Sequence, residues 1–266
     1  MRSAAVGFQC VECVKQGAAT IRTPKAAYGG KARANPEVTY ALLGLNVLMF
    51  LVTVGSGSPL GFGGGVSELF QKLALTPSLH CSFSDLDGTC IVVDGVAQGE
   101  YYRLLTAMFL HFGIIHIALN MYCLFLVGPA LERALGRLRF SALYLLSGLG
   151  GSALSYALGP QQEIAAGASG AVFGLFAGFY VLERRRGADV SQISVTIGLN
   201  LVLSFTISGI DWRGHVGGLI AGALVTAALV YPPAGKQRVL LQALGCTCVA
   251  VLIVGVVVMR TAQLTA

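Results

Sequence analysis

Long apolar stretches alternate with short polar connections along most of the chain. Most of these stretches approach the ~20 residues with which a helix spans the hydrocarbon of a bilayer. Seven can be marked, at residues 39–57, 104–127, 140–158, 169–182, 191–209, 214–231 and 239–259. The pattern predicts an all-α fold, a polytopic membrane bundle of seven transmembrane helices. With 55% hydrophobic and only 11% charged residues, the chain has more apolar surface than a soluble core buries.

The fourth stretch is the shortest, with about 14 residues, and it begins at Ser169. A helix rises only ~1.5 Å per residue, so a stretch of this length crosses part of the bilayer. We therefore expect its N-terminus, with Ser169, to lie below the outer surface.

Basic residues at the ends of the stretches predict the orientation, because lysine and arginine are retained in cytoplasmic segments. A cytoplasmic N-terminus and an extracellular C-terminus, in a multi-pass protein of the cell membrane, leave only Lys72, Arg103, Arg213 and Arg260 outside. The cytoplasmic set is larger: Arg2, Lys15, Arg22, Lys25, Lys31, Arg33, Arg133, Arg137, Arg139, Arg184, Arg185, Arg186, Lys236 and Arg238. This topology and contact with anionic membrane lipid explain the net charge of +6, and no nucleic acid partner is needed.

The cysteines outside the stretches leave two questions open. Cys10 and Cys13 form a CxxC knuckle in the N-terminal tail, half of a tetrahedral zinc site. The chain has no second cytoplasmic pair, so we expect no metal and no cofactor. Cys81 and Cys90, in the long loop between the first two stretches, are compatible with a disulfide or with two free thiols.

Polar residues inside apolar stretches are functional candidates, since each must find a partner away from lipid. His111, His116 and Asn120 lie in the second stretch and His215 in the sixth. Taken singly, each favours a structural role, in which the side chain bonds across helices to hold the bundle together. Ser169 changes the interpretation, because it adds a nucleophile at a similar depth.

The set can be assigned by chemical role. His215 would take the proton from the Ser169 hydroxyl, which is otherwise a poor nucleophile. Donors for the negative charge on an attacked carbonyl would be His116, Asn120 and the Ser169 N–H at a helix N-terminus. No carboxylate lies in the middle of a stretch, so we expect a dyad and exclude an aspartyl intramembrane protease. We interpret Asp211 as a loop acid, and Glu132 and Arg133 as structural groups at a helix end.

Glycines repeat every four residues beside both catalytic candidates. Gly170, Gly174 and Gly178 follow Ser169, and Gly218 and Gly222 follow His215. Such bare faces let helix backbones approach closely, which favours a contact between these two stretches.

These motifs together resemble those of the rhomboid family of intramembrane serine proteases. His111, His116 and Asn120 fit its HxxxxHxxxN pattern, and Gly167-Ala168-Ser169-Gly170 fits GxSG. The run from His215 through Gly218 to Gly222 fits HxxGxxxG, while Gly128, Glu132 and Gly136 fit GxxxExxxG. Two positions differ: Phe173 stands where the family often has a tyrosine that stacks on the histidine, and Tyr102 precedes Arg103 where tryptophan is usual.

The resemblance implies a domain organisation and a reaction. It implies a basic tail with CxxC at 1–38, a rhomboid six-helix catalytic core at 39–231, and a linker with a seventh transmembrane helix at 232–266. The implied enzyme cleaves single-span membrane proteins through an acyl-enzyme on Ser169, its substrates entering between the second and fifth helices. The alternatives are a non-catalytic rhomboid-like scaffold that binds transmembrane helices, and a small-molecule transporter, for which the chain shows no convincing internal repeat.

Overall fold

The structure is a computed structural model that describes residues 2–3, 7–20, 26–30, 35–61, 65–78, 80–83 and 90–266. Helices dominate the described part of the chain. They are α1 (Val11–Thr20), α2 (Glu37–Gly55), α3 (Glu68–Leu73), α4 (Arg103–Thr106), α5 (Ile114–Leu135), α6 (Arg137–Leu158), α7 (Ser169–Arg186), α8 (Ser191–Thr206), α9 (Trp212–Val230) and α10 (Arg238–Thr265), with 3-10 turns η1 (Val96–Gln98) and η2 (Ala107–Phe109). The predicted all-α class is confirmed.

Two short antiparallel hairpins lie outside the bundle. Strand β1 (Arg2–Ser3) pairs with β2 (Phe8–Gln9), and β3 (His80–Phe83) pairs with β4 (Cys90–Val93). In the second hairpin Cys90 stands opposite Phe83, and Cys81 opposite Val92. The side chains of Cys81 and Cys90, and with them the question of a disulfide, lie outside the described part of the chain.

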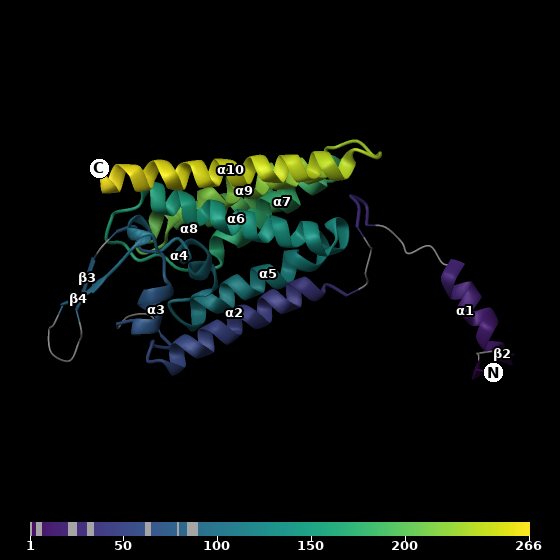
Figure 1. Cartoon of the computed structure of the whole chain (residues 1–266), viewed down its shortest axis with the longest axis horizontal. Coiled ribbons are helices and arrows are strands. Elements are labelled where there is room, and N and C mark those ends of the chain that lie inside the picture. Colours follow the sequence, from purple (N-terminus) through teal and green to yellow (C-terminus); the bar gives the residue numbers. More distant parts are fainter. Residues whose placement is uncertain are drawn as a thin grey trace.

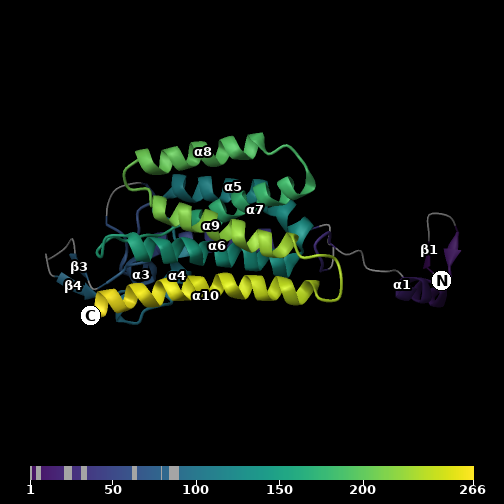
Figure 2. The same cartoon turned by 90° about the horizontal axis from the view of Figure 1, so that it is seen from above.

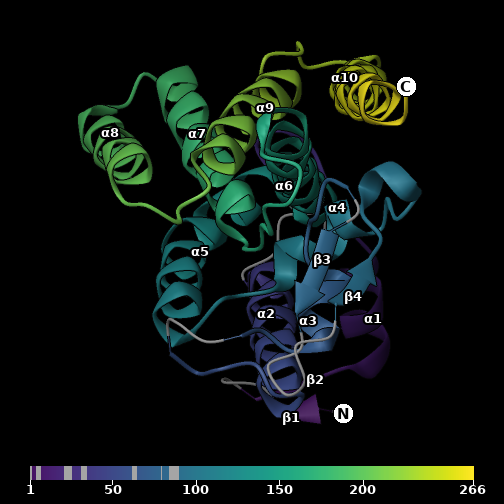
Figure 3. The same cartoon turned by 90° about the vertical axis from the view of Figure 1, so that its left-hand side faces the viewer.

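Helix α9 is the inner helix of the bundle. It packs against α6 and α7 most extensively and also contacts α8 and α10. Figures 2 and 3 show the row α8, α7, α9, α6 and α10, with α2 and α5 on one side of it. Of the most apolar 18-residue stretch of α9, 56% is buried, against 17–28% in α2, α5 and α10. The row therefore has a buried centre and two outer members, α8 and α10.

The outer helices turn large apolar side chains outward. Exposed leucines, valines and phenylalanines cover α2, α5, α8 and α10, an arrangement that suits contact with lipid and not with water. Among the described helices, α2, α5, α9 and α10 are long and apolar enough to cross a membrane, and α8 is a shorter apolar helix. The chain is a multi-pass membrane protein. Figure 1 shows the beginnings of α2 and α10 at one end of the bundle, and the C-terminus with the hairpin β3–β4 at the other.

Glycines bring α6, α7 and α9 into backbone contact. A Cβ on Gly218 would stand 1.9 Å from the Gly170 carbonyl oxygen, and one on Gly222 would stand 2.3 Å from that of Gly174. On α6, a Cβ on Gly151 would stand 2.6 Å from the carbonyl oxygen of Gly214. Atoms cannot approach this closely, so a larger residue at these positions would separate the helices.

Glu132 ties the end of α5 to the start of α2. Its buried carboxylate accepts hydrogen bonds from the Val38 and Thr39 N–H groups and from the Thr39 hydroxyl, at 2.8–2.9 Å. These N–H groups belong to the first turn of α2, where Pro36 provides no side-chain cap. The predicted structural role of Glu132 is confirmed, although the carboxylate caps a neighbouring helix.

The predicted second span, 104–127, is wrong in its boundaries. Residues 103–109 form the short helices α4 and η2, and the long helix α5 begins only at Ile114 and continues to Leu135. At the break, Gly113 lies against the backbone of residues 60–61, where a Cβ would stand 3.1 Å from the Gly61 carbonyl oxygen, and the Ile114 N–H bonds the Leu60 carbonyl. Apolar composition cannot separate a short interfacial helix from the span that follows it.

The glycine contacts predict that Gly218→Ala is strongly destabilising. The added methyl collides with the backbone of α7, and overpacking of this kind costs roughly 1–3 kcal/mol or more. Thermal unfolding in detergent should show a lower melting temperature. The matched control is Gly255→Ala on α10, where no atom lies within 4 Å of the new Cβ and the melting temperature should stay or rise. Equal effects of both substitutions would contradict a tight α7–α9 contact.

Candidate active site

Ser169 is the first residue of α7 and lies well inside the bundle. The following residue, Gly170, packs against Gly151 of α6: a Cβ on Gly151 would stand 3.2 Å from the Gly170 Cα. Gly151 lies seven residues before Leu158, where α6 ends. At ~1.5 Å per residue, Ser169 is thus about 10 Å below the end of α6. The N-terminus of α7 presents unbonded backbone N–H groups at that depth.

The segment that leads into Ser169 is held from both sides. Leu75 and Ala165 exchange two backbone hydrogen bonds of 2.9 Å, and the Gly167 N–H donates to the Ala107 carbonyl at 2.9 Å. Gly167 itself has φ +144°, a conformation that favours glycine. A Cβ there would stand 2.9 Å from His116 Nε2 and 3.5 Å from Ser169 Oγ. His116 and Ser169 therefore flank the same point.

His215 lies in the first turn of α9, whose N-cap is Asp211. The Asp211 carboxylate accepts from the N–H groups of Arg213 and Gly214 at 3.1 Å, so it fixes the helix end and does not contact the imidazole. The ring of Phe173, one turn after Ser169, stacks on the His215 ring with centroids 4.2 Å apart and planes 13° apart. On its edge, His215 Nδ1 makes a 2.6 Å hydrogen bond with the Ser204 hydroxyl of α8.

The structure brings Ser169 and His215 to the same end of the α7–α9 contact. Phe173 links them, because it follows Ser169 by one helical turn and covers the imidazole. In the described residues no hydrogen bond joins the Ser169 hydroxyl to His215. Catalytic hydrogen bonds are often long in proteins without substrate and tighten in the complex. Gly218 and Gly222 lie further along the same contact.

His116 and Asn120 lie on one face of α5. The Phe112 N–H donates to His116 Nδ1 at 3.4 Å, which leaves the proton of the neutral ring on Nε2, facing Gly167. The Asn120 amide donates one hydrogen to the His116 carbonyl at 3.0 Å and retains a second. Both residues therefore keep a donor.

His111 is not inside the second span. It precedes α5, in the connection after η2, where it is buried and packs edge-on against His116 with ring centroids 5.0 Å apart. The sequence placed it with His116 and Asn120 because the apolar stretch runs through both segments. Its position is that of a neighbour supporting His116.

A small cavity of about 40 Å³ opens beside Ser169. This volume is well above the roughly 10–15 Å³ that one buried water molecule needs. The cavity is lined by Leu75, Ala107, Gly148, Gly151, Ser152, Ser155, Ala165, Ala166, Gly167, Ser169, Gly170, Asp211 and Gly214. Serine hydroxyls, a carboxylate and glycine backbone line it in part, so the cavity suits water next to the Ser169 hydroxyl.

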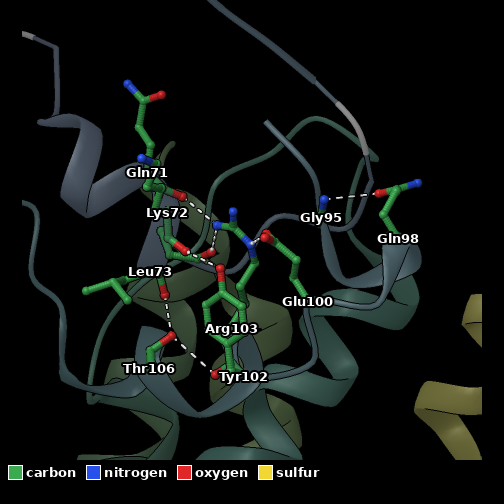
Figure 4. Close-up of polar contacts among 10 residues, drawn as sticks. Gln71, Lys72, Leu73, Gly95, Gln98, Glu100, Tyr102, Arg103 and Thr106 are labelled. Atoms are coloured by element: carbon green, nitrogen blue, oxygen red, sulfur yellow. Dashed lines mark hydrogen bonds and ion pairs between the residues drawn. The ribbon is translucent and has the colours of Figure 1, made fainter. Parts of the chain in front are cut away.

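Arg103, which the sequence analysis counts among the outside cations, has a buried side chain whose role the sequence did not reveal. Its side chain is 1% exposed and donates to the carbonyl oxygens of Gln71 and Ala74 and to the Glu100 carboxylate. Thr106 adds a bond from its hydroxyl to the Leu73 carbonyl at 2.6 Å. Figure 4 shows how these donors converge on the segment 71–74. Leu75, which pairs with Ala165, follows directly, so Arg103 helps to hold the segment that packs against the residues before Ser169.

Within the described residues, no group of three or more histidine, cysteine or acidic side chains is arranged to hold a metal ion. Cys10 and Cys13 are exposed at the start of α1. Hydrogen bonding from the Cys13 N–H lowers the pKa of the Cys10 thiol below its usual value, as expected at a helix N-terminus.

Comparison with known proteins gives consistent matches. The family model described as the Rhomboid domain matches residues 98–232. Rhomboid protease GluP of Bacillus subtilis (strain 168) is 38% identical over 205 residues, 75% of this chain and 36% of GluP. Putative rhomboid protease YdcA of the same organism is 40% identical over 137 residues, 50% of this chain and 69% of YdcA. RHOMBOID-like protein 6, mitochondrial, of Arabidopsis thaliana is 35% identical over 173 residues, 62% of this chain and 56% of the relative. The chain thus spans about a third of the length of GluP and just over half that of the Arabidopsis protein.

The loop network predicts that Arg103→Ala loosens the segment before Ser169. Removing a buried cation from its acceptors costs about 3 kcal/mol, and the pairing of Leu75 with Ala165 loses its support. Hydrogen exchange should become faster at the amides of Leu75, Ala165 and Gly167, with a lower melting temperature.

The control for this experiment is Lys72→Ala in the same loop. Lys72 pairs with Glu68 at 2.6 Å, but both side chains are more than half exposed, and surface ion pairs contribute little. Exchange at the three amides should then match that of the unchanged protein. If Arg103→Ala behaved in the same way, the network would not position the segment.

Proposed function

The chain belongs to the rhomboid family, and from this we propose that it is an intramembrane serine endopeptidase that uses Ser169 as nucleophile and His215 as general base. The observation that carries the proposal is the stacking of His215 on Phe173, 4.2 Å away and one helical turn after Ser169. It supports a base held beside the nucleophile at the N-terminus of α7. A scaffold that only bound helices would need neither group.

In the first half-reaction, His215 Nε2 takes the proton of the Ser169 hydroxyl as the oxygen attacks a substrate carbonyl. The attack gives a tetrahedral intermediate, with negative charge on the former carbonyl oxygen. Three donors are available for it: the Ser169 N–H at the helix N-terminus, the His116 Nε2–H and the second Asn120 amide hydrogen. Collapse of this intermediate breaks the peptide C–N bond, the imidazolium gives its proton to the leaving amine, and the acyl-enzyme remains on Ser169.

In the second half-reaction, water hydrolyses the acyl-enzyme. His215 removes a proton from a water molecule as its oxygen attacks the ester carbonyl, and then returns the proton to Ser169. The cavity beside Ser169 can hold such water next to the ester, although the site lies about 10 Å below the end of α6. The cavity supports hydrolysis at a depth where lipid would otherwise exclude water.

Single-span membrane proteins are the proposed substrates, because the site is buried in a bundle whose outer faces suit lipid. Entry between α5 and α8 is favoured because α8 is the outer member of the row and α5 lies beside that end of it, with exposed apolar side chains on both. The distribution of arginine and lysine supports a cytoplasmic N-terminus and an extracellular C-terminus in the cell membrane, with cleavage towards the outer face.

The dyad predicts that Ser169→Ala and His215→Ala each abolish cleavage of a fluorogenic single-span substrate in proteoliposomes. Loss of the nucleophile or of its base should lower kcat by roughly 10³-fold or more. Ser194→Ala, an exposed serine of α8, is the matched control and should cleave at the parent rate. Equal turnover by all four proteins would refute the dyad, and no cleavage by any would favour the scaffold.

The oxyanion donors predict a different result for His116→Ala and Asn120→Ala. Each should lower kcat by roughly 10²-fold, with little change in KM, because the donor acts on charge that exists only in the transition state. Melting temperatures measured in parallel separate this role from a structural one. A lower melting temperature with a normal kcat would assign both residues to helix packing.

A further inference from the structure

We propose that Ser204 of α8 is a positioning residue for His215, one that fixes the imidazole in the tautomer with its proton on Nδ1. This leaves Nε2 unprotonated and free to accept the proton of Ser169. The inference rests on the proposed function, because it assigns Ser204 to the base of that reaction.

The burial of Ser204 is unusual for its helix. Helix α8 is an outer helix, and Ser204 is the one buried residue among its members, at 3% exposed. Its neighbours Leu203 and Phe205 are large, apolar and 49% and 58% exposed. A polar group at the only buried position of an apolar helix needs a specific partner, since lipid and hydrocarbon side chains provide none.

Two short hydrogen bonds determine where the protons are. Ser204 Oγ lies 2.6 Å from His215 Nδ1 and 2.6 Å from the Asn200 carbonyl oxygen. A carbonyl oxygen only accepts, so the single hydroxyl hydrogen goes to Asn200. The Ser204 oxygen must then accept from His215, which requires a proton on Nδ1. In the neutral ring the other nitrogen, Nε2, is bare, as a general base requires.

The ring is held on two sides by two different helices. Phe173 of α7 covers its face, and Ser204 of α8 bonds its edge. Asp211, the acid nearest in sequence, is occupied by the N–H groups of Arg213 and Gly214. Ser204 thus occupies the place that a carboxylate takes in a serine protease triad, without adding a buried charge to the membrane interior.

The first test is kinetic. In proteoliposomes, Ser204→Ala should lower kcat about 10- to 100-fold, with KM unchanged. This loss is smaller than the ~10⁴-fold loss in kcat seen when a triad histidine is held in the wrong tautomer. The reason is that alanine leaves both tautomers of His215 populated. Ser204→Thr keeps the hydroxyl and should recover most of the loss. The matched control is Ser194→Ala. The Ser194 hydroxyl also donates to the carbonyl four residues earlier, that of Val190, at 2.7 Å, but this serine is exposed. Its loss should leave kcat and KM unchanged.

The second test needs no turnover. Histidine labelled with ¹⁵N, in the Ser169→Ala background at about pH 8, above the ordinary histidine pKa of ~6.5, reports which ring nitrogen carries the proton. The His215 signals are those lost in His215→Gln. We expect a protonated Nδ1 and a bare Nε2, changing to a mixture when Ser204→Ala is added.

These outcomes separate the two proposals. Cleavage by Ser169→Ala at the parent rate would overturn the proposed function, and the role of Ser204 with it. If Ser169 is required, the role of Ser204 alone is overturned by a proton on Nε2 in the Ser204-containing protein, by ¹⁵N spectra that Ser204→Ala does not change, or by an unchanged kcat in Ser204→Ala.

Discussion

The contact between the backbones of α7 and α9 is the constraint on which the site depends. Gly170 and Gly218 meet where a single methyl group would overlap the facing carbonyl, and Gly174 and Gly222 repeat the contact one turn on. Because this contact begins directly beside Ser169 and His215, the packing that joins the helices also fixes how these two residues lie relative to each other. If α7 or α9 shifted along the other helix, Ser169 and His215 would move apart.

Three buried polar side chains each join separate elements of the fold. Glu132 caps α2, Arg103 holds the carbonyl oxygens of the outer loop, and Ser204 bonds His215. The first two act at opposite ends of the bundle, where α2 begins and where the segment before Ser169 is held. A polar side chain without a partner would be costly in this environment, so each of these groups also specifies which elements are neighbours.

Much of the fold follows from the sequence, because an apolar helix in lipid must satisfy its backbone internally and must be long enough to cross. The apolar stretches placed the start of α7 at Ser169 and the start of α9 within two residues of Trp212, and the glycine repeats predicted the seam between the two helices. The boundary of α5 was not predictable, since residues 104–113 are as apolar as the span and only their backbone contacts with residues 60–61 separate them. The burial of Arg103 depends on carbonyl oxygens from residues 71–74, which composition does not reveal.

Ser204 gave no motif and was missed. The only local signal is a serine four residues after Asn200 in an apolar stretch, a spacing that usually means a bond to the helix backbone. Its partner comes from α9, and only the arrangement of the two helices brings them together.

Helix α8 also has a mechanical consequence. With one buried residue, it shares most of its surface with lipid, so bilayer thickness and lateral pressure act on it more directly than on any inner helix. The hydroxyl that faces inward is the one in contact with the imidazole. A displacement of α8 relative to α9 would therefore lengthen the hydrogen bond between Ser204 and His215 Nδ1.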